Sequence, residues 1–218
     1  MKRIGLIVAY DGTITVDGRF SQRCHDTRRA ERCLSELLGE EIETIGASRT
    51  DAGVHAMGNV AVFDTETRMP GEKISYALNQ RLPEDIRIQL SEEMPMDFHP
   101  RYCDSVKTYE YRILNRRFQI PTERLYSYFY HYKLDEKKMR EATSYLIGRH
   151  DFASFCGAGA QVKSTVRTIR SIEVERFEDM VTIRISGEGF LYNMVRIIAG
   201  TLIEIGNGQY PLSGCRRF

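Results

Sequence analysis

The sequence predicts an α+β protein built from two similar halves. Short apolar, β-branched stretches alternate with amphipathic stretches at helical spacing, and this order of elements begins again after about 100 residues. A chain of 218 residues is long enough to form both halves. We therefore place the first half at residues 1–104 and the second half at residues 105–218.

The first half begins and ends with a strand. Its first strand is a compact apolar run that Asp11-Gly12 ends, and its last strand alternates apolar with polar residues. Gly39 follows one helical stretch and Pro83 follows the other, and both residue types end helices. The expected elements are, in order, a strand at Ile4–Tyr10, a helix at Arg28–Leu38, strands at Glu41–Ile45 and Gly58–Asp64, a helix at Glu72–Leu82 and a strand at Ile86–Leu90.

The second half repeats this alternation. Tyr109 and Tyr111 share one face of its first strand, Asp135 is placed to cap a helix, and Gly148 to end it. The short connection 177–179 favours a hairpin. The expected elements are strands at Lys107–Leu114 and Tyr126–Tyr132, a helix at Asp135–Ile147, strands at Thr168–Arg176 and Met180–Ser186, and a helix at Phe190–Ile205.

The composition excludes several classes of protein. No apolar run approaches the roughly 18 residues of a membrane span, and the basic-then-apolar N-terminus is too short for a signal peptide. The five cysteines are scattered without a C-x-x-C pair, which argues against a zinc site or a disulfide framework and for the reducing cytoplasm. The net charge is only +1, so a polyanionic partner must be held by a local basic patch.

The most unusual stretch is the loop Gly46–Ala56, which is rich in small residues. It presents one carboxylate, Asp51, flanked by Arg49 and His55. Small residues let a backbone approach a ligand closely, and a carboxylate can act as a nucleophile when a partner orients it. The alternative is a plain turn in which Asp51 bonds its own backbone.

Arg196 is a candidate partner for this carboxylate. It lies inside the apolar helical stretch at Phe190–Ile205, and arginine is almost never fully buried without a partner. One interpretation is that it reaches solvent from the edge of the helix. The other is a buried pair with an acidic group of the first half, for which Asp51 is the attractive candidate.

An aromatic strand surrounded by basic residues is the third feature. Tyr109 and Tyr111 are typical of a sheet surface or core, but an aromatic ring beside cations is also how an extruded base is stacked. The basic residues are ordinary solvated side chains or, together, a patch for RNA. They are Arg101, Lys107, Arg112, Arg116, Arg117, Lys163, Arg167 and Arg170.

The stretch Gly-Ala-Ser-Arg-Thr-Asp-Ala-Gly-Val-His at 46–55 resembles the signature loop of the tRNA pseudouridine synthase A (TruA) family. Further segments resemble the family in the same order, so that the likeness covers roughly residues 36–212 as well as Ile4–Thr13. These segments are 78–86, Phe98-His99-Pro100-Arg101, Lys107–Arg112, Asp151-Phe152-Ala153-Ser154-Phe155 and Phe190–Gly206.

The resemblance implies an enzyme that isomerises uridine to pseudouridine at positions 38, 39 and 40 of the tRNA anticodon stem-loop. It also implies two ferredoxin-like halves with antiparallel sheets and a central basic cleft. A homodimer without cofactor or metal, and with no membrane association, is implied as well. Residue by residue, Asp51 matches the catalytic aspartate, Tyr109 the tyrosine that stacks on the target base, and Arg196 the arginine paired with the aspartate. Arg49 matches the arginine that holds the nucleotide out of the stack, and His55 belongs to the same signature.

Two segments depart from the family pattern. Residues 14–33 replace a Gly-Trp-Gln-type segment and a helix start, and the chain contains no tryptophan. The chain also stops at Phe218, before the segment that completes the second half in the family, which is therefore expected to be truncated. Permissible codons read in other frames restore family-like residues, so we favour frameshifts in the gene, which resequencing would test. The 218-residue product is then expected to lack a first-half helix and a last strand.

The interpretation that best fits the residues is that the chain is a cytoplasmic, cofactor-free tRNA pseudouridine synthase with Asp51 as nucleophile. One alternative is a non-catalytic RNA-binding protein on the same scaffold. The other is a pseudouridine synthase for another RNA position. Attack on the sugar and attack on the base are both open.

Overall fold

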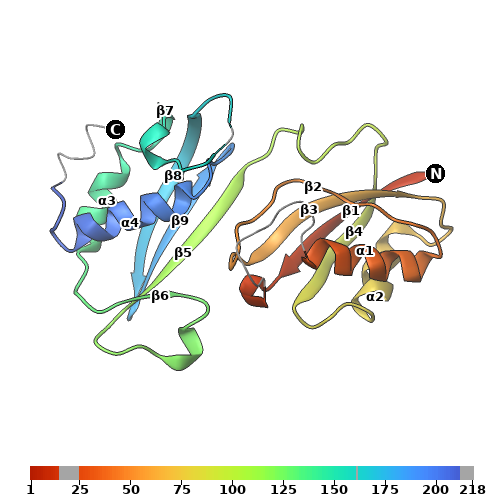
Figure 1. Ribbon diagram of the computed structural model, residues 1–218, viewed down its shortest axis with the longest axis horizontal. Coiled ribbons are helices and arrows are strands. Elements are labelled where there is room, and N and C mark those ends of the chain that lie inside the picture. Colours follow the sequence, from red (N-terminus) through yellow and green to blue (C-terminus); the bar gives the residue numbers. More distant parts are fainter. Residues whose placement is uncertain (15–24, 161, 212–218) are drawn as a thin grey trace. The chain divides into compact units, whose positions relative to one another are not determined.

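The structure is a computed structural model that describes residues 1–14, 25–160 and 162–211 (Figure 1). The chain divides into two compact units, residues 1–103 and residues 104–218. Each unit has its own sheet and its own buried core. The class is therefore α+β, as predicted, with one sheet in each unit.

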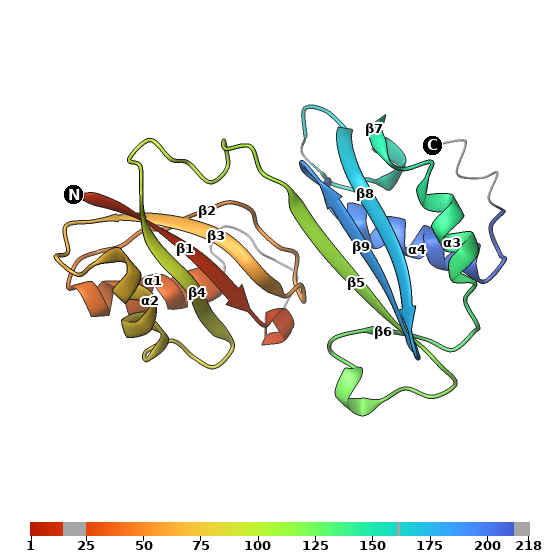
Figure 2. The same ribbon diagram turned by 180° about the vertical axis from the view of Figure 1, so that it is seen from behind.

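The first unit has the element order β-α-β-β-α-β. Its sheet runs β2-β3-β1-β4 with antiparallel pairs throughout, which is the ferredoxin-like arrangement. The two helices cover one face of this sheet (Figures 1 and 2). The elements are β1 (Lys2–Tyr10), the 3-10 turn η1 (Gly12–Ile14), α1 (His25–Leu38), β2 (Ile45–Gly46), β3 (Ala56–Thr65), α2 (Gly71–Asn79) and β4 (Ile86–Met94).

The helix expected to be lost from the first half is present. α1 runs through the end of the segment that departs from the family, and Leu34 on it is fully buried. The apolar positions of α1 recur at helical spacing, so the altered residues still form an amphipathic helix. Arg29 adds an ion pair of 2.8 Å to Asp85. The rest of the departing segment, residues 15–24, lies outside the described residues.

The strand expected at Glu41–Ile45 is almost absent, because β2 covers only Ile45–Gly46. Side chains of α1 take the main-chain donors that a strand would use. The Ile42 N–H donates to the Ser35 hydroxyl at 3.0 Å, and the Thr44 N–H donates to the Glu31 carboxylate at 2.9 Å. These bonds give the segment an irregular path that still satisfies its backbone.

The second unit contains a sheet of order β6-β5-β9-β8-β7. The β5–β6 pair is parallel and the other pairs are antiparallel. Helices α3 and α4 cover one face of the sheet (Figures 1 and 2). The elements are β5 (Lys107–Asn115), η2 (Pro121–Glu123), β6 (Tyr128–Tyr130), α3 (Glu136–Thr143), β7 (Gly148–Asp151), η3 (Ala153–Phe155), β8 (Val166–Phe177), β9 (Met180–Gly187) and α4 (Met194–Gly206).

Local signals set most of these boundaries. Asp135 caps α3 by accepting hydrogen bonds from the N–H groups of Lys137 and Lys138, as expected. The β8–β9 hairpin turns at Glu178, whose φ of 51° is left-handed. α3 ends four residues before the expected Ile147, because the Tyr145 and Leu146 N–H groups donate to the Ala142 and Thr143 carbonyls in tight turns. The strand β7 then starts at Gly148 and pairs with β8. Residues 213–218, the second stretch attributed to a frameshift, lie outside the described residues.

None of the helices in the part of the chain that the structure describes is long and apolar enough to cross a membrane. The longest, α1, has 14 residues.

Candidate active site

The loop that carries Asp51 connects β2 to β3 and is tied down at its base. The Ala47 N–H donates to the Val60 carbonyl at 2.7 Å, and the Asn59 amide donates to the Ser48 carbonyl at 3.1 Å. From elsewhere in the unit, the Arg101 guanidinium donates to the Gly46 carbonyl at 2.8 Å. The base of the loop is thus an extension of the sheet.

The far side of the loop is held against the end of β1. The Thr50 and Tyr10 hydroxyls lie 2.6 Å apart, and the Gly12 N–H donates to His55 Nδ1 at 3.1 Å. Gly12 also approaches Val54 so closely that a Cβ at this position would lie 2.7 Å from the Val54 carbonyl carbon. The loop therefore has a defined position relative to β1, and glycine is the residue that this close approach requires.

Asp51 stands on the exposed part of the loop. A turn does form there, but the main chain forms it: the Val54 N–H donates to the Asp51 carbonyl at 3.1 Å, and Gly53 takes a left-handed φ of 76°. Among the described residues, the Asp51 carboxylate takes part in no hydrogen bond to its own backbone. Asp51 is exposed, as is Arg49 two residues away.

His55 has a structural place in this arrangement. Its Nδ1 faces both the Gly12 N–H and, at 3.0 Å, the Asp11 carboxylate. Nδ1 accepts the hydrogen bond from the Gly12 N–H. The contacts with Gly12 and Asp11 connect the loop to the residues after β1. Sequence reasoning did not single out Asp11 or Tyr10, although Asp11-Gly12 was the signal for the end of the first strand.

The second unit groups the other predicted residues around one end of β5. The rings of Tyr109 and Phe190 meet edge to face, with centroids 5.1 Å apart. Arg196 is exposed in the first turn of α4, so its own unit does not bury it. Burial raises the pKa of the Tyr111 phenol, and the nearby Arg196 charge opposes that shift. Tyr109, Tyr111 and Arg196 therefore belong to one neighbourhood.

The predicted residues thus form two groups. Arg49, Asp51 and His55 share one loop of the first unit, whereas Tyr109 and Arg196 share one region of the second. The pairing of Asp51 with Arg196 stays a prediction.

Comparison with known proteins decides the family. A sequence model described as tRNA pseudouridine synthase matches residues 6–103 and 142–218. The chain belongs to the tRNA pseudouridine synthase family. The match contains the Asp51 loop and Arg196, whereas Tyr109 lies in the unmatched segment between its two parts.

Relatives that match this pseudouridine synthase over most of their length are named tRNA pseudouridine synthase A. The tRNA pseudouridine synthase A of Acetivibrio thermocellus is 46% identical over 211 residues, which are 96% of this chain and 86% of the relative. The tRNA pseudouridine synthase A 2 of Clostridium tetani is 48% identical over 209 residues, which are 94% and 84%. A tRNA pseudouridine synthase A from Thermoanaerobacter is 43% identical over 210 residues, which are 96% and 86%. The predicted family is therefore confirmed.

Proposed function

We propose that this chain isomerises uridine to pseudouridine at positions 38, 39 and 40 of the tRNA anticodon stem-loop, with Asp51 as the nucleophile. Membership of the tRNA pseudouridine synthase family supports the reaction. The exposed carboxylate of Asp51, on a loop fastened both to β3 and to the end of β1, is the observation that carries the assignment of the residue.

The reaction starts when the target nucleotide leaves the helical stack, which costs a few kcal/mol. The Asp51 carboxylate then attacks the sugar or C6 of the base, and the bond between N1 and the sugar breaks. The base turns and forms the new bond from C5 to the sugar. The bond between Asp51 and the sugar or C6 breaks, which returns Asp51 as a free carboxylate. The proton on C5 is removed and N1 gains a proton, so the overall reaction is an isomerisation with no net gain or loss of atoms.

The other residues orient the reactants in this proposal. Arg196 pairs with Asp51, keeps it ionised and aims it, because an adjacent cation favours the charged carboxylate. Tyr109 stacks on the extruded base and assists removal of the C5 proton. Arg49 holds the nucleotide out of the stack. The contact of His55 with Gly12 supports a positioning role for His55.

The proposal extends to the assembly. We place the tRNA in a basic cleft between two domains, residues 1–104 and 105–218. The enzyme acts as a homodimer in the cytoplasm, and its chemistry as written uses protein side chains alone. The family resemblance supports these points.

Pseudouridine mapping on tRNA tests the proposal. The parent protein should form pseudouridine at positions 38–40, and Asp51→Asn should abolish it while leaving most of the tRNA affinity, because phosphate contacts supply most of that affinity. Asp97→Asn, which changes another exposed carboxylate of the same unit, is the matched control and should retain activity.

The other outcomes separate the alternatives. Pseudouridine at a different RNA position would keep the proposed reaction and change the target nucleotide. Binding of tRNA by the parent without any product would favour a non-catalytic RNA-binding protein. Full activity of Asp51→Asn would remove Asp51 from the mechanism.

A further inference from the structure

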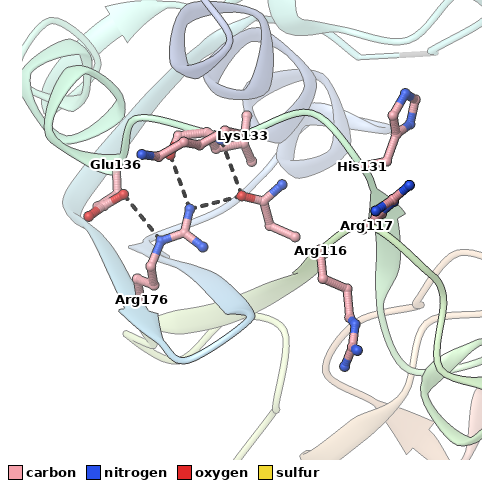
Figure 3. A pocket seen from close by; sticks show the side chains of 8 residues that line it. Arg116, Arg117, His131, Lys133, Glu136 and Arg176 are labelled. Carbon is pink, nitrogen blue, oxygen red and sulfur yellow. Dashed lines mark hydrogen bonds and ion pairs between the residues drawn. The ribbon is translucent and has the colours of Figure 1, made fainter.

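A second basic site lies in the second unit, beyond the end of β5. It is a pocket of about 400 Å³ whose floor contains Asn115, Glu136 and Arg176 and whose rim carries basic side chains (Figure 3). Its rim residues are Arg116, Arg117, His131 and Lys133. All four lie between residues 104 and 141, a segment that the family model does not match.

The floor of this pocket is hydrogen-bonded within the protein and electrically balanced. Arg176 donates from Nε to the Glu136 carboxylate at 3.2 Å and from Nη2 to the Asn115 side-chain oxygen at 2.9 Å. The buried Asn115 in turn donates to the Tyr130 and Tyr132 carbonyls at 2.8 and 2.6 Å. Each of these floor groups has its partner inside the protein, so the floor needs no ligand to satisfy it.

The rim, by contrast, carries uncompensated positive charge. Arg116 pairs with the exposed Asp179 at 3.2 Å. Neither Arg117 nor Lys133 takes part in any ion pair between described residues, and Arg117 instead lies over the Phe118 ring at 5.1 Å. The whole chain has a net charge of only +1, so this concentration of cations is a local feature.

The arrangement of the rim indicates the kind of anion that fits. Arg116 and Arg117 extend away from Arg176 rather than toward a common point (Figure 3). Arg117 and Lys133 are exposed to solvent. Separated, exposed cations match a series of phosphates along a strand better than one enclosed phosphate, which requires converging donors.

The distance to Tyr109 connects this rim with the proposed reaction. Asn115 follows Tyr109 by six residues on the same strand, which places the pocket about 20 Å along β5 from Tyr109. Phosphates recur at every nucleotide along an RNA backbone. An RNA whose target base lies at Tyr109 and whose backbone follows β5 therefore has phosphates at the distance of the rim.

We propose that the rim residues Arg117 and Lys133 bind phosphodiester groups of the tRNA, about 20 Å from the target nucleotide. This inference rests on the proposed function. The site supplies affinity and register without reading sequence, because phosphates are the same at every nucleotide.

The test is the salt dependence of tRNA binding by Arg117→Gln/Lys133→Gln. Loss of two phosphate contacts should make the fall in affinity between 50 and 200 mM salt roughly tenfold smaller than for the parent. Arg68→Gln/Lys73→Gln is the matched control, because it also removes one exposed arginine and one exposed lysine, the latter lying over the Tyr76 ring at 5.7 Å. The control should keep the slope of the parent.

Interference mapping adds the position of the contact. Ethylation of phosphates about 20 Å from the target nucleotide should weaken tRNA binding by the parent and have no effect on binding by Arg117→Gln/Lys133→Gln, the pocket variant. If the pocket variant keeps the salt slope of the parent, and the parent forms pseudouridine, the phosphate-binding role of the pocket is overturned and the proposed function stands. A parent that binds no tRNA would overturn both. Inorganic phosphate could instead bind the parent and not the pocket variant, while the salt slope of tRNA binding is the same in both. That result would assign the site to free phosphate and overturn the proposal.

Discussion

Gly12 lies directly against Val54, so the end of β1 and the Asp51 loop are in backbone contact. A Cβ on Gly12 would overlap the Val54 carbonyl group, and main-chain atoms cannot move aside as a flexible side chain can. The geometry of the loop thus depends on a residue about 40 positions earlier in the chain.

Gly12→Ala should therefore lower the rate of pseudouridine formation at least tenfold, since a misplacement of about 1 Å can cost on the order of a hundredfold. Single-turnover kinetics on tRNA measures this. Gly58→Ala is the control, because its Cβ would meet only an Ile7 methyl group at 3.6 Å. Equal rates for Gly12→Ala and the parent would contradict the idea that this contact positions the loop.

The ring of Tyr109 should contribute to tRNA binding and its hydroxyl to the rate of the reaction. Tyr109→Phe keeps the edge contact with Phe190, so tRNA affinity should stay within about twofold while the rate falls. Tyr109→Leu removes the ring and should weaken binding by about tenfold, within the range of roughly 1–3 kcal/mol for stacking on a base. Filter binding and single-turnover rates measure the two effects, and full activity of Tyr109→Phe would remove the hydroxyl from proton transfer.

The Arg3–Asp64 pair should make the stability of the first unit depend on acid pH. Arg3 donates to both carboxylate oxygens of Asp64 at 2.8 Å, and these bonds lower the pKa of the Asp64 carboxyl against the opposing effect of burial. A lowered folded pKa means that the stabilisation is present above the unfolded value of about 3.9 and is lost as the pH falls through the folded value.

Asp64→Asn should accordingly lower the melting temperature near pH 7 by about 2–4 °C, which corresponds to roughly 1 kcal/mol for a chain of this size. The difference from the parent should shrink as the pH falls below about 4. Thermal unfolding followed across pH 2–7 checks this, and a difference that does not change with pH would argue that the loss comes from packing alone.

Asn115 should be the most sensitive polar residue of the second unit. Its side chain donates to two carbonyls and accepts from the Leu134 N–H and from Arg176. Asn115→Ala leaves these buried groups without partners and should cost about 3 kcal/mol. Denaturant unfolding measures the cost, with Asn59→Ala, which loses a single bond to Ser48, as the milder comparison at about 1 kcal/mol. A cost for Asn115→Ala no larger than that of Asn59→Ala would contradict this role.

Local patterns in the sequence determined most of the elements and the candidate residues. The apolar run at Ile4–Tyr10, the cap at Asp135 and the turn around Glu178 each predicted a feature that the structure confirms, because alternation, capping and turn formation involve neighbouring residues. The loop around Asp51 was also recognisable, since its small residues and its single carboxylate are contiguous. The same holds for the family, whose segments occur in order along the chain.

Only the tertiary structure decided which distant groups meet. The sequence of Glu41–Ile45 predicts a strand, but its main-chain N–H groups donate to Ser35 and Glu31 of α1. Those contacts depend on how α1 packs. The closeness of Gly12 and Val54 and the network around Asn115 likewise join residues far apart in sequence. Periodicity reports which face of an element is apolar, whereas these contacts depend on where whole elements lie in space. For that reason the Asp51 loop and the basic residues Arg116 and Arg117 were noted from the sequence. Their grouping with Lys133 around one pocket beyond β5 was found only in the fold.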